Sequence, residues 1–83
     1  MARSKKIAPE NIDKYIALGL NIAYYRKRAG MTQEQLAAKA GISRAYLGEI
    51  EAPKMITTIS LEVLFGIAQA LNMPAYKLMA FRS

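Results

Sequence analysis

The sequence predicts an all-α fold of five helices in a single small domain. Its apolar residues recur at helical rather than alternating spacing, and the chain is rich in alanine while it contains only one valine. Residues that begin helices (Ser, Thr and Pro) precede the apolar runs, and residues that end helices (Gly and Asn) follow them. The length of 83 residues leaves room for one domain.

The first helix is expected to begin at Pro9 and to end at Gly30. Proline at the first helical position forfeits no hydrogen bond, and glycine readily adopts the left-handed conformation that ends a helix. One face of this segment carries mostly apolar residues and one arginine: Ile12, Tyr15, Ile16, Gly19, Ile22, Ala23 and Arg26. Residues 1–8 are expected to form a basic, flexible tail, and residues 9–83 the folded domain.

Two short helices are expected next, separated by a tight turn. Thr32 begins a capping box, so the second helix is expected from residue 33 to about 40, where a glycine ends it. Ser43 caps the third helix, which ends before Pro53, because a proline disfavours helical geometry in the preceding residue. Together, residues 32 to about 52 have the spacing of a helix-turn-helix unit.

A fourth helix is expected after Ser60, which is placed as its N-cap, and Asn72 can supply the left-handed conformation that ends it. Its buried stripe is predicted to consist of Leu61, Leu64, Phe65, Ala68 and Leu71. A short fifth helix is expected to start at Met73-Pro74 and to reach residue 79.

The composition excludes several kinds of chemistry. Without cysteine and histidine the chain has no disulfide framework, no thiol nucleophile and no imidazole acid or base, and we expect neither a cofactor nor a metal. Twelve basic against six acidic residues give a net charge of +6, which predicts an anionic partner. No apolar run has the length of a membrane span and no signal-peptide core follows the N-terminus, so we expect a cytoplasmic protein that does not bind a membrane. The sequence also gives no sign of a small-molecule ligand.

Four segments occur in the order and spacing of the motif residues of the lambda and 434 phage repressor family (Cro/CI or XRE type). They are Thr32-Gln33-Glu34-Gln35-Leu36-Ala37, Gly41-Ile42-Ser43-Arg44, Tyr46-Leu47 and Ile50-Glu51. The chain closely resembles this family of bacterial regulators. The resemblance implies a five-helix, double-stranded DNA-binding transcriptional regulator, a repressor acting as a homodimer on a near-palindromic operator. An enzyme is not expected, because the chain has neither histidine nor cysteine and its carboxylates show no catalytic pairing. The chain departs from the family at Pro53, where a glycine is usual, and in a longer loop over residues 52–59.

The resemblance also implies roles for individual residues. Gln33 occupies the position of a phosphate-contacting and buttressing residue, and Arg26 and Glu51 occupy that of an ion pair between the first and third helices. The positions implied to face the DNA are Ser43, Arg44, Ala45 and Glu49. Residue chemistry adds further candidates for DNA contact, which are Tyr46, Gly48 and the basic residues Lys27, Arg28, Lys39 and Lys54.

Most of these residues also have a purely structural interpretation. A cation in the first turn opposes the helix dipole, so Arg44 is interpreted as functional. Ala45 is either a good helix former or a partner of a thymine methyl. Gly48 costs about 1 kcal/mol inside a helix relative to alanine, which indicates close approach of either DNA or another helix.

The roles of Glu49 and Tyr46 are open in the same way. Glu49 either accepts a hydrogen bond from cytosine or pairs with Lys54, and the ion pair is slightly favoured. Tyr46 is expected to pack against the domain with its hydroxyl exposed, where it could still reach a phosphate.

Dimerisation is predicted from an apolar C-terminal cluster of Met73, Tyr76, Met79 and Phe81, for which packing onto the domain's own core is the alternative. A different functional class also stays open, namely a protein-interaction module such as an antitoxin-like partner or a co-regulator.

Overall fold

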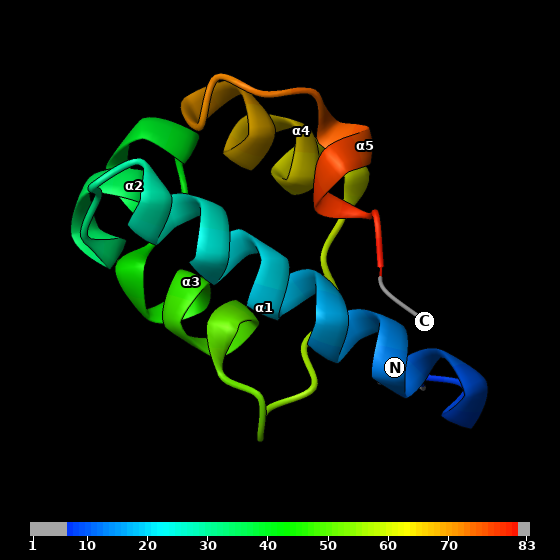
Figure 1. Ribbon diagram of the computed structural model, residues 1–83. Coiled ribbons are helices and arrows are strands. Elements are labelled where there is room, and N and C mark those ends of the chain that lie inside the picture. The colour runs from blue at the N-terminus through cyan, green and yellow to red at the C-terminus, as the bar shows by residue number, and fades with distance from the viewer. Residues whose placement is uncertain (1–6, 82–83) are drawn as a thin grey trace.

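The computed structural model describes residues 7–81, and every regular element in that range is helical (Figure 1). The elements are the 3-10 helix η1 (Pro9–Asn11) and the α-helices α1 (Ile12–Arg28), α2 (Gln33–Ala40), α3 (Arg44–Glu51), α4 (Leu61–Ala70) and α5 (Ala75–Leu78). The predicted all-α fold of five α-helices is therefore confirmed. The tail predicted at residues 1–8 falls largely on residues 1–6, outside the described residues.

The predicted helix ends are present. Thr32 Oγ1 accepts from the Gln35 backbone N–H at 3.0 Å while Gln35 Oε1 accepts from the Thr32 N–H at 2.9 Å, which completes the capping box. Ser43 and Ser60 cap α3 and α4 through their hydroxyl oxygens. Positive φ angles at Gly41 (75°) and Asn72 (57°) end α2 and α4 as expected. Two elements differ from the prediction at their ends. The chain enters α1 through the 3-10 turn η1, and α5 begins at Ala75, after Pro74, and ends at Leu78, before residue 79.

A small core fills the space between the helices. Its five fully buried large side chains come from all five α-helices: Ile22, Leu36, Leu47, Ile67 and Leu78. The backbones of α1 and α3 touch, because a Cβ on Gly19 would collide with the carbonyl oxygen of Ile50. This crossing determines where the C-terminal end of α3 lies relative to α1 (Figure 1).

The predicted stripe of α4 is partly wrong. Leu64 and Ala68 are buried, but Leu61 and Phe65 are 64% and 53% exposed, and Leu71 is only half-buried. The cause is the position of α2, since a Cβ on Gly66 would lie 3.1 Å from the carbonyl oxygen of Ala40. Close contact on the Gly66 side turns the face that carries Phe65 toward solvent.

Candidate nucleic-acid interface

The helices α2 and α3 form a compact pair joined by a three-residue turn. Ala37 of α2 is 2% exposed in the core, and its carbonyl oxygen accepts the Ile42 N–H at 3.0 Å. The left-handed Gly41 reverses the chain between them. This arrangement is the helix-turn-helix that the spacing predicts.

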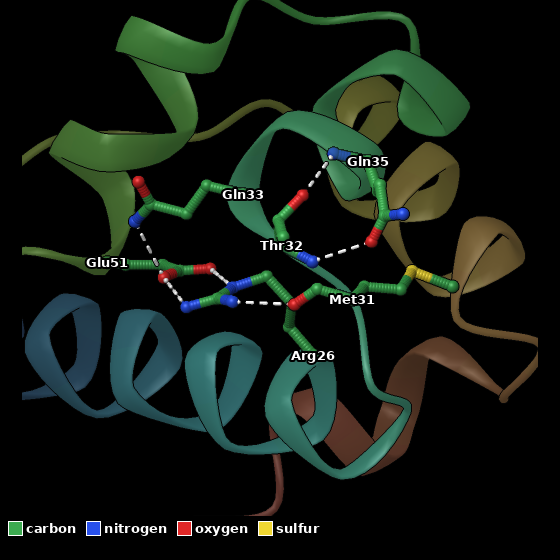
Figure 2. A network of polar contacts seen from close by, with 6 residues as sticks. All are labelled: Arg26, Met31, Thr32, Gln33, Gln35 and Glu51. Atoms are coloured by element: carbon green, nitrogen blue, oxygen red, sulfur yellow. Dashed lines mark hydrogen bonds and ion pairs between the residues drawn. The ribbon is translucent and has the colours of Figure 1, made fainter.

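A buried ion pair fixes the C-terminal end of α3. Arg26 Nε and Nη2 donate to the two carboxylate oxygens of Glu51 at 2.9 and 3.0 Å, and the residues are 8% and 7% exposed. Arg26 Nη1 also donates to the carbonyl oxygen of Met31 at 2.8 Å (Figure 2). The structure thus brings together the two residues that were predicted to pair, and it ties both to the turn before α2.

Gln33 is the third partner of this network. Its Nε2 donates to Glu51 Oε1 at 3.0 Å, so the first residue of α2 is joined to the last residue of α3 (Figure 2). The resemblance implied a buttressing role for Gln33 without naming the residue that it supports, which is Glu51. Within residues 7–81 no buried side-chain nitrogen or oxygen lacks a partner, so the network is fully satisfied.

Arg44, Gly48 and Gln33 lie together on the outer side of α3. A Cβ placed on Gly48 would lie 3.8 Å from both Arg44 Nη1 and Gln33 Oε1, and no other heavy atom outside its own helix backbone and chain neighbours lies nearer within the described residues. These are ordinary van der Waals distances. Within residues 7–81, close packing of another helix therefore does not require a glycine at position 48, so the helix-packing alternative is not supported.

The N-terminal half of α3 is open to solvent. Ser43, Arg44 and Ala45 are exposed, and the Ser43 hydroxyl oxygen caps the helix by accepting the Tyr46 N–H at 3.0 Å. Glu49 is exposed as well, and among residues 7–81 it forms no ion pair with Lys54. The slightly favoured ion-pair interpretation of Glu49 is thus not supported.

Tyr46 differs from its prediction. It packs half-buried against the core as expected, but its hydroxyl is not free, because it donates to the carbonyl oxygen of Thr58 at 3.2 Å. The hydroxyl proton that a phosphate would need is already used. Tyr46 instead anchors the loop that follows α3.

The basic residues predicted at the rim are all exposed, namely Lys27, Arg28, Lys39 and Lys54. Arg28 is held in place, because its Nη1 donates to the Tyr24 hydroxyl at 3.0 Å and its guanidinium lies 5.7 Å from the centre of the Tyr24 ring. The hydrogen bond is the main cause that raises the pKa of Arg28 above its ordinary value. The i to i+4 spacing of Tyr24 and Arg28 is a signal from which the sequence could have predicted this contact.

The predicted dimerisation cluster is divided. Met73 and Phe81 pack against the core, whereas Tyr76 and Met79 are 70% and 49% exposed. The large apolar residues exposed on α4, on α5 and directly after α5 are Leu61, Phe65, Tyr76 and Met79. We call them the α4–α5 surface. A hollow of about 270 Å³ lies between Leu61 and Met79 of this surface and the first turns of α1.

Within residues 7–81 no helix is both long and apolar enough to cross a membrane.

Comparison with known proteins identifies the family. Residues 22–78 match a family model described as helix-turn-helix, which covers the network and both helices of the unit. The chain is 31% identical to a hypothetical transcription factor of Neisseria meningitidis over 86% of this chain and 65% of that protein, so it spans just under two thirds of that relative. It is 36% identical to the control protein C.SmaI of Serratia marcescens over 75% of this chain and 71% of that protein.

Among solved structures, the biofilm master regulator SinR, determined in complex with DNA, superposes with a TM-score of 0.68 at 33% identity, covering 74% of this chain and 95% of that one. The family-model match spans more than half of the chain and coincides with the helix-turn-helix seen in the structure. The chain therefore belongs to the XRE-type helix-turn-helix family of DNA-binding transcriptional regulators.

Proposed function

We propose that this regulator recognises a specific double-stranded DNA sequence through the open N-terminal half of α3, as a homodimer on an operator of two-fold symmetry, and that it represses transcription there. The observation that carries the proposal is the contrast between the two ends of α3. Glu51 is held by three hydrogen bonds from Arg26 and Gln33, while Arg44 and Ala45 are exposed and free to contact bases. A helix fixed at one end can present the other in a defined orientation to the major groove.

Affinity is assigned to the phosphate contacts. The net charge of +6 favours a polyanion, and Lys27 and Lys54 extend into solvent near the two ends of the helix-turn-helix unit. The N-terminus of α2 adds free backbone N–H groups beside Gln33, which favour a phosphate whatever the base. These contacts position the protein on any duplex and carry little sequence information.

Discrimination is assigned to Arg44. Its planar guanidinium can donate two hydrogen bonds to O6 and N7 of guanine, which is worth about 1 to 3 kcal/mol against a wrong base. Gln33 Oε1 and Arg44 Nη1 both lie within van der Waals distance of the Gly48 Cβ position, so the absence of a side chain there leaves the space beside Arg44 open. An approaching base pair or backbone would fill that space.

Dimerisation is assigned to the α4–α5 surface. Phe65 and Tyr76 are more than half exposed, and a second copy would bury them. Two identical recognition helices would then read half-sites about 10 base pairs apart, centre to centre.

Selection of bound duplexes from a random pool tests the proposal. We expect enrichment of one sequence arranged as an inverted repeat, and sedimentation at micromolar concentration should show a dimer. A reporter promoter overlapping the selected site should lose transcription when the protein is supplied. Enrichment of no sequence would contradict specific recognition, and enrichment of a single half-site bound by a monomer would contradict the dimer.

A further inference from the structure

The hollow between α1 and the α4–α5 surface is closed on its inner side by the core. Its floor consists of the buried side chains of Leu18 and Leu64. Its walls come from three separate parts of the chain, namely the first turns of α1, the segment that leads into α4 and the segment that follows α5 (Figure 1). The volume of about 270 Å³ lies just below the roughly 300 to 1,000 Å³ of typical ligand pockets. The hollow therefore has the size for a small molecule, whereas a helix with its side chains is about 10 Å across.

The walls of the hollow are apolar. They carry aliphatic and aromatic side chains: Tyr15, Ile59, Leu61, Met79 and Phe81. Two of these, Leu61 and Met79, remain largely exposed, so this apolar surface is not buried by the fold itself. An apolar molecule that enters the hollow removes such surface from water, which is favourable. The part of a ligand that fills the hollow is therefore hydrocarbon.

One edge of the hollow is polar. Lys14 and Asn11 both line it, and Lys14 Nζ donates to Asn11 Oδ1 at 3.3 Å. Among residues 7–81, Lys14 forms no ion pair and is the only charged residue of the lining. The side-chain amide of Asn11 adds N–H donors. An ammonium group and an amide at the edge of an apolar hollow favour a ligand with a negative group, because hydrogen bonds to a charged acceptor are the stronger ones.

We propose that the hollow binds a small amphipathic acid, whose hydrocarbon body lies on Leu18 and Leu64 and whose carboxylate lies beside Lys14 and Asn11. The inference goes beyond the proposed function and does not depend on it, because no residue of the hollow is assigned to DNA. Since Leu61 and Met79 belong to both the hollow and the α4–α5 surface, a second copy of the chain is the competing occupant.

Octanoate is the probe, and its binding to the full chain is measured by isothermal titration calorimetry without DNA. Octanol has the same chain without the charge, octylamine has the same chain with a positive charge, and acetate has the carboxylate without the chain. We expect octanoate to bind most tightly, octanol more weakly and octylamine more weakly still, while acetate should not bind. Hexanoate should bind roughly tenfold more weakly than octanoate, because it buries fewer methylene groups.

The variant Lys14→Gln tests the polar edge. It should lower the affinity for octanoate roughly threefold, as expected for the loss of an exposed ion pair, and leave the affinity for octanol unchanged. Lys14 is exposed, so the substitution leaves the core intact. Lys39→Gln is the matched control, because Lys39 is an exposed lysine on α2 outside the hollow, and it should change neither affinity.

NMR of the methionine methyl groups locates the bound probe. Met79 lines the hollow, whereas Met55 lies in the loop after α3, and their exposed fractions of 49% and 50% are nearly equal. Octanoate should shift the methyl signal of Met79 in a saturable manner and leave that of Met55 in place. The pair therefore separates binding in the hollow from adsorption of hydrocarbon to any exposed apolar side chain.

Several outcomes would overturn the inference. Absence of octanoate binding, or equal shifts at Met79 and Met55, would remove the site. Equal affinities for octanoate and octanol, both unaffected by Lys14→Gln, would remove the assignment to an acid. The double variant Phe65→Ser with Tyr76→Ser should bind octanoate as the wild type does, because neither residue lines the hollow. Loss of binding in that variant would place the hydrocarbon between two copies instead of within one chain.

Discussion

The helix-turn-helix and the C-terminal helices present opposite kinds of surface. Between residues 33 and 51 no large apolar side chain is exposed, whereas the α4–α5 surface exposes Leu61, Phe65, Tyr76 and Met79. The first region faces solvent with polar groups, the cations of Lys39 and Arg44 and the carboxylates of Glu34 and Glu49. The second faces solvent with aromatic and aliphatic groups. Within one small domain, the hydrated polar surface that we propose for DNA is thus kept apart from the apolar surface that we propose for a second copy.

The two regions are also held together differently. The α2–α3 unit is joined to α1 by a satisfied network of charged and polar groups around Glu51. The α5 segment relies on apolar packing of Leu78 and on one amide, Asn21, whose Nδ2 donates to the Leu78 carbonyl oxygen at 2.8 Å. Directional hydrogen bonds fix the orientation of α3, the helix that we propose to read bases.

The largest effect is expected from breaking the network. Glu51→Ala should lower the free energy of unfolding by about 3 to 5 kcal/mol, because it leaves the buried guanidinium of Arg26 without its carboxylate. Chemical denaturation followed by circular dichroism measures the change. Glu49→Ala is the matched control, since Glu49 is exposed on the same helix, and it should shift stability by no more than about 0.5 kcal/mol.

The coupling of the pair is tested by a double-mutant cycle with Arg26→Ala. Because the two residues share their hydrogen bonds, the combined loss should be smaller than the sum of the single losses. Strictly additive losses would show that the pair contributes no interaction energy.

The helix-turn-helix could be predicted almost completely from the sequence, because its signals are local. Thr32, Ser43 and Gly41 are recognised by residue type and spacing, and the resemblance supplied the pairing of Arg26 with Glu51. What could not be predicted depends on distant neighbours. The carbonyl that accepts from the Tyr46 hydroxyl belongs to Thr58, which nothing in the local sequence indicates.

The C-terminal region was harder to predict for the same reason. Helical spacing permits Phe65 on the buried stripe of α4. Because Gly66 approaches the carbonyl oxygen of Ala40 closely, α4 is oriented so that Phe65 faces solvent instead. The division of the C-terminal cluster, with Phe81 packed and Tyr76 exposed, likewise follows from how α5 docks.

The second-largest effect is expected from disrupting the α4–α5 surface. The double variant Phe65→Ser with Tyr76→Ser should weaken dimerisation by roughly a hundredfold, because it removes two aromatic groups that the second copy would bury. Sedimentation equilibrium measures the dissociation constant. Leu20→Ser, on an exposed part of α1, should leave it unchanged, and a dimer that survives the double variant would place the interface elsewhere.

The third effect concerns base reading. Arg44→Ala should reduce the difference in binding free energy between operator and random duplex by about 1 to 3 kcal/mol and relax the preference at one base pair per half-site. Lys27→Ala should instead weaken binding to both duplexes by a similar factor, because a phosphate contact is blind to sequence. Both are measured at matched salt, and an unchanged ratio for Arg44→Ala would assign discrimination to another residue.

The smallest effect is expected at Gly48, where stability and binding should change in opposite directions. Gly48→Ala should raise the free energy of unfolding by up to about 1 kcal/mol, because alanine is the better helix former and the added Cβ would meet only atoms 3.8 Å away. The same Cβ should weaken DNA binding, since it occupies the space beside Arg44 that we assign to the duplex.

Gly19→Ala is the contrasting variant, because its Cβ would strike the carbonyl oxygen of Ile50 and must destabilise the fold. If Gly48→Ala stabilises the protein and binds the operator as well as the wild type does, the duplex does not approach α3 at this residue, and the recognition helix must lie in the groove with its Ala45 side inward instead.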